Sequence, residues 1–118
     1  MPPRRDSQSY QTGKLAEWLC ILRLWLTGWR ILATRWRSPA GEIDLIAVRG
    51  RQLAFVEVKA RRNHDEAVTS LSATQRQRIQ QAAGMWLASH PKYAGHECRF
   101  DVMSVSKWPW PRCYENAF

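Results

Sequence analysis

Residues 42–60 read EIDLIAVRGRQLAFVEVKA. As a strand, residues 42–48 would place Ile43, Leu45 and Ala47 on one face and Glu42, Asp44 and Ile46 on the other, which is typical of a strand that has one buried face. The polar turn at residues 49–52 leads into a second run of strand-forming residues that ends at Ala60. We therefore predict an antiparallel β-hairpin over residues 42–60 and interpret the rest of the chain outward from it.

The segments before the hairpin predict a helix followed by a strand. Apolar residues spaced three and four apart indicate a one-sided helix from residue 13 that ends at Gly28, and residues 29–37 alternate as in a strand. Residues 1–12 carry no such spacing and are predicted to be a disordered basic arm. The helix residues expected to face the core are Leu15, Trp18, Leu19, Leu22, Trp25 and Leu26.

After the hairpin, a polar connection precedes a second helix, which Ser70 or Ser72 would cap and which ends near Ser89. Residues 99–106 alternate again and predict a last strand. This order of elements predicts an α/β or α+β fold in which a mixed sheet is flanked by helices, with one domain over residues 13–107. The expected buried stripe of the second helix is Leu71, Ile79, Ala82, Ala83, Trp86 and Leu87.

Tryptophan is abundant, at 7 of 118 residues. Trp18, Trp25, Trp29 and Trp86 fall on apolar stripes and are expected in the core. The tail at residues 108–118 is rich in tryptophan and proline, and proline cannot donate to a sheet ladder. We expect this tail either to fold back over the core or to dock another subunit.

Composition narrows the class of protein. With 118 residues the chain is long enough for one domain, and 18 basic against 10 acidic residues give a net charge of +8, which favours a polyanionic partner. The 3 cysteines have no C-x-x-C spacing, so they fit neither a disulfide scaffold nor a zinc ribbon. The interrupted apolar run at residues 15–26 fits neither an export signal nor a membrane span. We expect a cytoplasmic protein with no membrane partner.

Charged residues within the hairpin indicate a candidate metal-binding and catalytic site. Asp44, Glu57 and Lys59 lie in mid-strand, where an unpaired buried charge is costly. Glu57 and Lys59 share a face because they are two residues apart, and the hairpin can bring Asp44 to that face. Two carboxylates suit Mg²⁺ or Mn²⁺, which activates water for attack on a phosphodiester, while Lys59 orients the nucleophile or stabilises the transition state. An ion-pair network on a solvated sheet face is the alternative.

The same residues carry a resemblance to known proteins. Asp44 followed by Glu57-Val58-Lys59 resembles the D-x(n)-(D/E)-x-K pattern of the PD-(D/E)XK nuclease superfamily. The longer blocks GEIDLIA (residues 41–47) and FVEVKAR (residues 55–61) closely resemble the bacterial UPF0102 family, also called YraN-like. The likeness extends to Ala16-Glu17, residues 82–87 and residues 99–102, and spans roughly residues 13–106.

The resemblance implies a restriction-endonuclease-like fold with Asp44, Glu57 and Lys59 as catalytic residues and the two carboxylates as metal ligands. Archaeal Holliday-junction resolvases have a similar layout with a further glutamate on the first helix, which makes Glu17 an additional candidate ligand. An exposed helix residue is the plainer interpretation of Glu17. The sequence departs from the family at Gln75, where many members have lysine, and at Arg35, where asparagine is common.

Basic residues near the second helix are candidates for nucleic-acid binding: Arg61, Arg62, Arg76 and Arg78, with Gln75 as an uncharged donor. A solvated helix face is the alternative. Three functions follow: a Mg²⁺- or Mn²⁺-dependent endonuclease acting on DNA, with branched or damaged DNA as its substrate; a DNA- or RNA-binding protein of this fold without useful turnover; and an adaptor whose tail binds protein. A dimer is expected if the likeness to resolvases extends to assembly.

Overall fold

The computed structural model describes residues 3–60, 71–105 and 110–118, and the side chains from residue 14 onward. Within this part of the chain, five strands form one sheet in the order β1-β2-β3-β4-β5. Strands β3 and β4 run parallel, and the other neighbours are antiparallel. The elements are α1 (Pro3–Leu26), β1 (Arg30–Arg37), β2 (Glu42–Arg49), β3 (Gln52–Ala60), α3 (Ala73–Ser89), the short 3₁₀ helix η1 (Pro91–Tyr93), β4 (Glu97–Val105) and β5 (Arg112–Tyr114).

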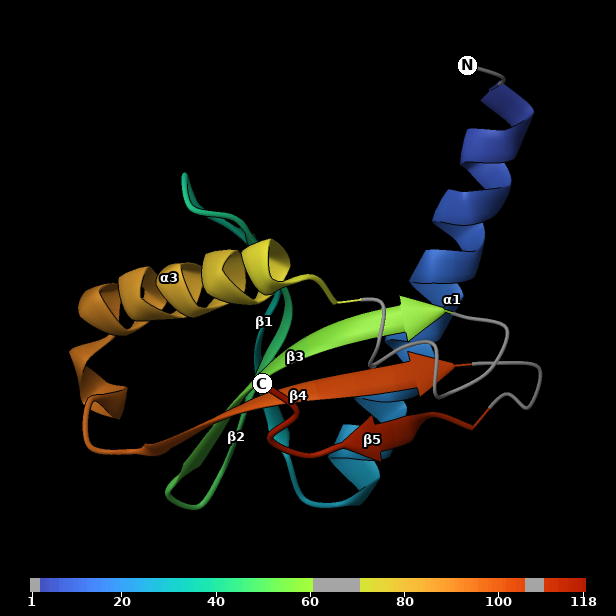
Figure 1. The fold of residues 1–118 in the computed structure, drawn as a ribbon. Coiled ribbons are helices and arrows are strands. Elements are labelled where there is room, and N and C mark those ends of the chain that lie inside the picture. Colours follow the sequence, from blue (N-terminus) through green and yellow to red (C-terminus); the bar gives the residue numbers. More distant parts are fainter. Residues whose placement is uncertain (1–2, 61–70, 106–109) are drawn as a thin grey trace.

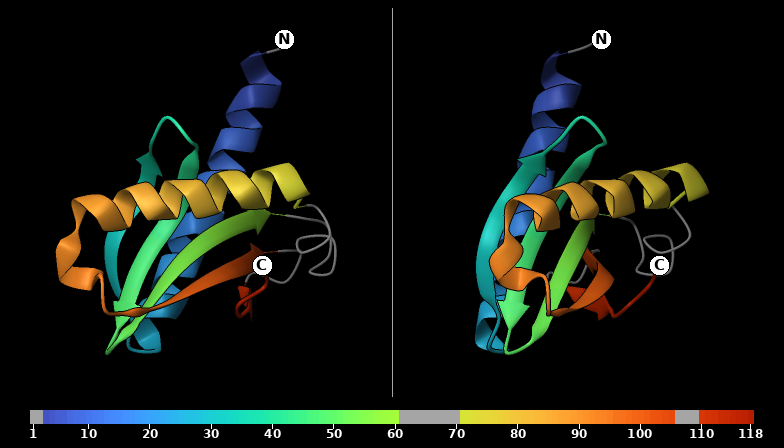
Figure 2. Two further views of the ribbon diagram at one scale, coloured as in Figure 1. Left: turned by 60° about the vertical axis from the view of Figure 1, so that its left-hand side comes forward. Right: turned by 90° about the vertical axis from the view of Figure 1, so that its left-hand side faces the viewer.

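The two helices cover opposite faces of the sheet (Figures 1 and 2). On the α3 face, Phe55 meets Trp86 edge to face with 6.0 Å between ring centroids and stacks on Phe100 at 5.4 Å. On the α1 face, Leu24 and Cys20 pack with a second apolar cluster that includes the even-numbered β3 residues Ala54 and Val56. The predicted mixed sheet flanked by helices, an α+β fold, is confirmed.

Helix α3 follows its prediction closely. Ser72 is the N-cap: its hydroxyl accepts the Gln75 N–H at 3.1 Å, and Gln75 Oε1 accepts the Ser72 N–H at 3.0 Å. This reciprocal capping box satisfies two backbone donors that a helix start leaves unpaired. Five of the six residues predicted for the buried stripe are buried, and Leu87 is partly buried.

Helix α1 differs from its prediction in two ways. It begins at Pro3, so residues 3–12 are helical where a disordered arm is expected. Proline suits the first turn, and no further proline or glycine interrupts the helix before Gly13.

The second difference is the face that α1 buries. Ala16, Cys20 and Leu24 are buried against the sheet. Five residues predicted to face the core are exposed instead, so these predictions are wrong: Leu15, Trp18 (61%), Leu22, Trp25 (70%) and Leu26. The small side chains of Ala16 and Cys20 let the helix lie close to the sheet. Trp29 and Trp86 are buried as expected.

The C-terminal tail folds back onto the sheet. Strand β5 pairs antiparallel with β4, the Ala117 N–H donates to the Phe100 carbonyl at 2.7 Å, and Phe118 lies 5.4 Å from the Phe100 ring. Trp110 is 42% exposed, and Trp108 lies outside the described residues.

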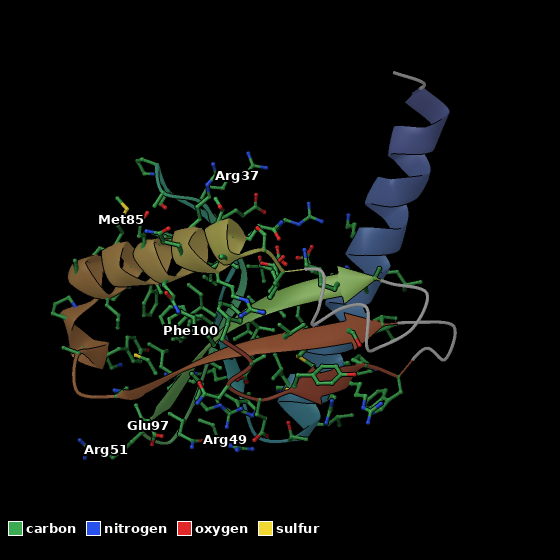
Figure 3. All side chains as sticks on the ribbon, viewed as in Figure 1. Arg37, Arg49, Arg51, Met85, Glu97 and Phe100 are labelled. Carbon is green, nitrogen blue, oxygen red and sulfur yellow. The ribbon has the colours of Figure 1, made fainter. Side chains whose placement is uncertain are left out.

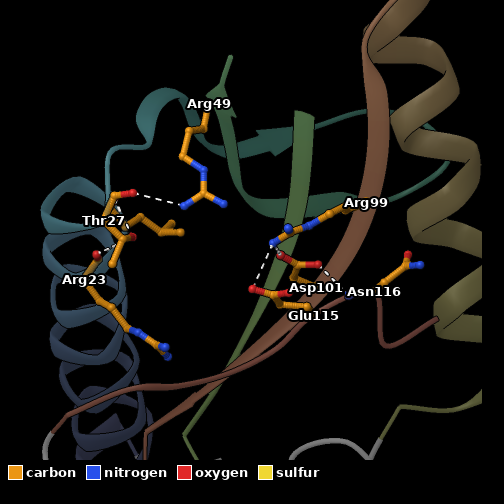
Figure 4. Close-up of polar contacts among 8 residues, drawn as sticks. Arg23, Thr27, Arg49, Arg99, Asp101, Glu115 and Asn116 are labelled. Carbon is orange, nitrogen blue, oxygen red and sulfur yellow. Dashed lines mark hydrogen bonds and ion pairs between the residues drawn. The ribbon is translucent and has the colours of Figure 1, made fainter. Parts of the chain in front are cut away.

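A buried carboxylate holds this tail in place (Figure 4). Asp101, 1% exposed, accepts the Asn116 N–H at 2.7 Å and pairs with Arg99 at 2.7 Å. Glu115 lies 3.8 Å from the same guanidinium. Asp101 therefore joins β4 to the residues after β5.

The cysteines Cys20, Cys98 and Cys113 are all free thiols. Cys20 is buried, Cys113 is half-buried and Cys98 is exposed. Burial raises the pKa of the Cys20 thiol to about 12 and that of Cys113 to about 11. In the described ranges, no helix has the length and apolar character needed to cross a membrane.

Candidate active site

The site forms where β2 and β3 separate. Their ladder runs from Arg49 opposite Gln52 to Leu45 opposite Val56. One residue further, the Asp44 carboxylate accepts the Val58 N–H at 2.8 Å. A side-chain oxygen thus takes the place of a backbone acceptor, and this bond fixes Asp44 beside the residues that flank Val58.

Asp44, Glu57 and Lys59 come together as the strand pattern predicts. The Asp44 and Glu57 side chains share a hydrogen bond, and Lys59 Nζ lies 3.5 Å from Glu57 Oε1. The Glu57 and Lys59 side chains are 15% and 12% exposed, so both are largely withdrawn from water. The arrangement is a mostly buried carboxylate pair with one ammonium, rather than an ion-pair network on a solvated face.

The two carboxyl groups affect each other's protonation. Burial raises the pKa of Glu57 to about 8, and the charge and hydrogen bond of Asp44 add to the increase, while Lys59 opposes it. Burial also raises the pKa of Asp44, although the Val58 N–H works against this, and the charges of Glu17 and Glu42 contribute. Near neutral pH the pair therefore holds one shared proton, with the Glu57 carboxyl donating to the Asp44 carboxylate.

This donor set fits a divalent cation. Among the described residues, no group of three or more His, Cys, Asp or Glu side chains is placed to hold a metal ion. Mg²⁺ commonly binds through one or two carboxylates and completes its shell with waters and substrate phosphates. Asp44 and Glu57 would hold such an ion, whose charge would replace the shared proton in offsetting their repulsion.

A pocket of about 310 Å³ opens beside the carboxylate pair. Asp44, Glu57, Gly41 and Glu42 line its sheet side, and Leu71, Gln75, Arg78 and Ile79 line its α3 side. A Cβ at Gly41 would lie 3.4 Å from the Arg78 Cβ, so the loop approaches the helix closely at this point. The pocket therefore has a carboxylate wall that faces a wall with an amide and a guanidinium.

Only some of the residues predicted to contact nucleic acid lie at the pocket. Gln75 and Arg78 line the pocket, whereas Arg76 does not, and the buried Arg76 Nε has no hydrogen-bond partner among the described residues. The Gln75 carbonyl oxygen is engaged in the α3 cap, which leaves its amide NH₂ to donate. Arg61 and Arg62 lie outside the described residues.

Glu17 does not join the carboxylate pair as a third ligand. Its carboxylate pairs with Arg35 Nε at 2.7 Å, although it lies near enough to raise the pKa of Asp44. Arg35 has a φ of 50°, in the left-handed region that most side chains disfavour. The ion pair with Arg35 accounts for the position of Glu17.

The sequence did not predict that Gly41, Leu71 and Ile79 line the pocket. Leu71 and Ile79 were predicted only as core residues, because periodicity does not show where a buried stripe meets an opening. The cap role of Gln75 had a visible signal in the Ser72-x-x-Gln75 spacing.

The fold and the site define an α+β domain with a buried carboxylate pair and a lysine on adjoining strands. Residues 16–105 match the profile of the uncharacterised protein family UPF0102. UPF0102 proteins of Mesorhizobium japonicum and Methylorubrum extorquens are 44% and 47% identical to this chain over 117 residues. Each alignment covers 99% of the chain, and 94% and 91% of the respective relatives. A UPF0102 protein of Chelativorans sp. is 45% identical over 94% of the chain and 90% of its own length. The chain belongs to the UPF0102 family.

Proposed function

We propose that this protein is a metal-dependent nuclease that hydrolyses phosphodiester bonds in DNA, with Mg²⁺ or Mn²⁺ held by Asp44 and Glu57. The observation that carries the proposal is the hydrogen-bonded carboxylate pair with Lys59 3.5 Å from Glu57, at the wall of an open pocket. Two buried carboxylates this close are unfavourable unless a proton or a cation offsets their charge.

Each residue of the proposed site has a separate role in the reaction. When bound, the cation would stabilise charge on the phosphate and lower the pKa of an attacking water. Lys59 orients that water or stabilises charge on the reacting phosphate, because its ammonium is held next to Glu57. Arg78 and the Gln75 amide on the opposite wall of the pocket bind phosphate oxygens of the substrate.

The free thiols support a cytosolic location.

Cleavage assays of the purified full chain test the proposal. Linear, nicked, flapped and four-way DNA would be incubated with Mg²⁺, with Mn²⁺ and with a chelator. We expect cleavage only with metal, and a loss of at least about 100-fold in Asp44→Asn and Lys59→Ala, because each removes a charge at the reacting centre. Glu97→Gln, at the far end of the sheet (Figure 3), is the matched control and should retain activity. Cleavage that survives Asp44→Asn would reject the site.

A second function has one observation in its favour. The sequence has Gln75 where the resemblance has lysine, and the Gln75 oxygen is engaged in the helix cap. This reduces the positive charge opposite the carboxylates and favours a DNA- or RNA-binding protein without turnover. DNA affinity with no cleavage under any metal condition would support this alternative.

A further inference from the structure

Helix α1 carries a second apolar stripe that nothing in the described part of the chain covers. Five of the seven large hydrophobic side chains that are exposed there lie on this helix. We call them the outer stripe: Leu15 (61% exposed), Trp18 (61%), Leu22 (41%), Trp25 (70%) and Leu26 (64%). With 3.6 residues per turn, they lie opposite the buried Ala16, Cys20 and Leu24. Helix α1 is therefore apolar on two opposite sides.

Within residues 15–26 the charged residues are Glu17 and Arg23, and both are turned away from the outer stripe. Lys14, one turn before Trp18, is exposed at the N-terminal end of the stripe. Glu17 pairs with Arg35 on β1, and Arg23 donates to the Pro111 carbonyl at 2.9 Å. A solvated helix normally places its charges outward, so this distribution is that of a helix with partners on both sides.

A hollow adjoins the outer stripe. It has a volume of about 280 Å³ and is lined by Lys14, Glu17, Trp18 and Ile21 of α1 and by Thr34 and Arg35 of β1. Trp18 belongs both to the hollow and to the outer stripe. The surface thus offers an apolar ridge and, beside it, a cavity large enough for an aromatic side chain.

We propose that the outer stripe is the interface of a homodimer, in which the α1 helices of two copies pack antiparallel about a two-fold axis near Leu22. This register places Trp25 of each copy opposite Trp18 of the other, beside the hollow. The surface is self-complementary, as a two-fold interface requires, because each copy provides both the projecting indole of α1 and the hollow between α1 and β1. The same helix extends beyond the sheet at its N-terminal end (Figures 1 and 2).

The area is sufficient for such an interface. A large aromatic side chain can bury about 150–250 Å². On this scale, the exposed parts of the five side chains of the outer stripe add up to an area on the order of 500 Å² per copy. Two copies would bury about 1,000 Å², the lower limit for a specific interface. We expect a dimer that dissociates in roughly the micromolar range, in which Trp18 and Trp25 contribute most of the affinity. This inference does not depend on the proposed nuclease activity.

Sedimentation analysis of the full chain over a range of protein concentrations tests the inference. Wild type should show a monomer–dimer equilibrium, and Trp25→Glu should weaken it at least about 30-fold, the effect of losing a central aromatic anchor. Met85→Glu is the matched control, because Met85 is a 43% exposed hydrophobic side chain on the outer side of α3 (Figure 3) and should leave the dimer intact. Circular dichroism would verify that each variant is folded.

A second variant tests the position of the proposed two-fold axis through a covalent link. Leu22→Cys places a thiol near the proposed axis, so mild oxidation should yield a covalent dimer well beyond the level of wild type, whose native cysteines provide the baseline. Met85→Cys should not exceed that baseline. A wild type that stays monomeric at about 100 µM, far above the expected dissociation constant, would overturn the inference. So would Trp25-dependent binding of the monomer to anionic phospholipid vesicles, which would identify a lipid surface as the partner.

Discussion

At the residue scale, the proton shared by Asp44 and Glu57 makes this pair sensitive to pH. Glu57 holds its proton to about pH 8, far above the ordinary 4.5 of a glutamate. The unfolded chain releases that proton near its ordinary pKa. Folding therefore takes up a proton between these two values, and a cation competes for the same two oxygens.

The sign of the pH dependence follows from this uptake. Because the folded state binds more protons between pH 4.5 and 8, the free energy of unfolding should fall as pH rises through this window, by up to about 1.4 kcal/mol per pH unit. Glu57→Gln should flatten that slope and raise Tm at pH 8. Added Mg²⁺ or Mn²⁺ should stabilise wild type more at pH 8 than at pH 6. Thermal unfolding at several pH values measures both effects.

The control for this prediction is Glu97→Gln, which changes an exposed carboxylate and should keep the wild-type slope. A Glu57→Gln profile parallel to that of wild type would show that the carboxyl pair does not share a proton. A metal effect that persists undiminished in Asp44→Asn would place the ion elsewhere.

Arg35 shows how a neighbouring residue restrains Glu17. Its φ of 50° costs roughly 1 kcal/mol for an ordinary side chain, while asparagine adopts this conformation more readily. The asparagine that the resemblance has at this position fits the backbone for that reason. In this chain Arg35 keeps the strained conformation and pairs with Glu17 at 2.7 Å, so the third carboxylate is held by an arginine.

At the element scale, the two halves of the fold differ in how well the sequence predicts them. The hairpin and α3 could be predicted because alternation and a single apolar stripe each permit one orientation. The site residues followed from the same alternation, which places Glu57 and Lys59 on one face of β3. For α1, periodicity correctly indicated a helix but not which of its two apolar stripes meets the sheet. That choice depends on the side-chain sizes of Ala16 and Cys20 and on partners far away in sequence.

Strand β4 contributes a carboxylate that stabilises the fold and lies away from the site. Asp101 is opposite Val56 in the parallel register, so it shares the α1 face, whereas Glu57 lies on the other face. Asp101→Asn should lower the free energy of unfolding by about 3 kcal/mol, because the largely buried Arg99 guanidinium loses its nearer carboxylate and keeps only the more distant, exposed Glu115. Urea unfolding followed by circular dichroism measures this change.

Glu115→Gln is the matched control, since the Glu115 side chain is 66% exposed and 3.8 Å from Arg99. It should change stability by less than about 0.5 kcal/mol. If Asp101→Asn were equally mild, the link between β4 and the tail would contribute little to stability.

At the scale of the whole molecule, the net charge of +8 should make nucleic-acid binding steeply dependent on salt. Each phosphate that is neutralised releases counterions, so the logarithm of the binding constant falls linearly with the logarithm of salt concentration. Arg78→Ala should reduce that slope by about 1, because Arg78 lines the pocket. Titration of labelled DNA across a salt series provides the measurement.

Arg51→Ala is the matched charge control, because Arg51 is exposed at the end of the sheet remote from the pocket (Figure 3). The salt dependence of DNA binding by Arg51→Ala should have the same slope as that of wild type. Equal slopes for both variants would mean that DNA contacts a surface other than the pocket, and no binding at low salt would favour the adaptor function.

The uneven burial of the three thiols makes the protein suitable for site-selective labelling. A maleimide reacts with the thiolate form of cysteine. The raised pKa values and the burial of Cys20 and Cys113 suppress this reaction, whereas Cys98 is exposed and can react. Cys98 is opposite Leu53, four residues before Glu57 along β3, so a fluorophore there would sit about 13 Å along the strand from the carboxylate pair. One dye per chain could thus report the approach of DNA or of a second copy while the site stays unmodified.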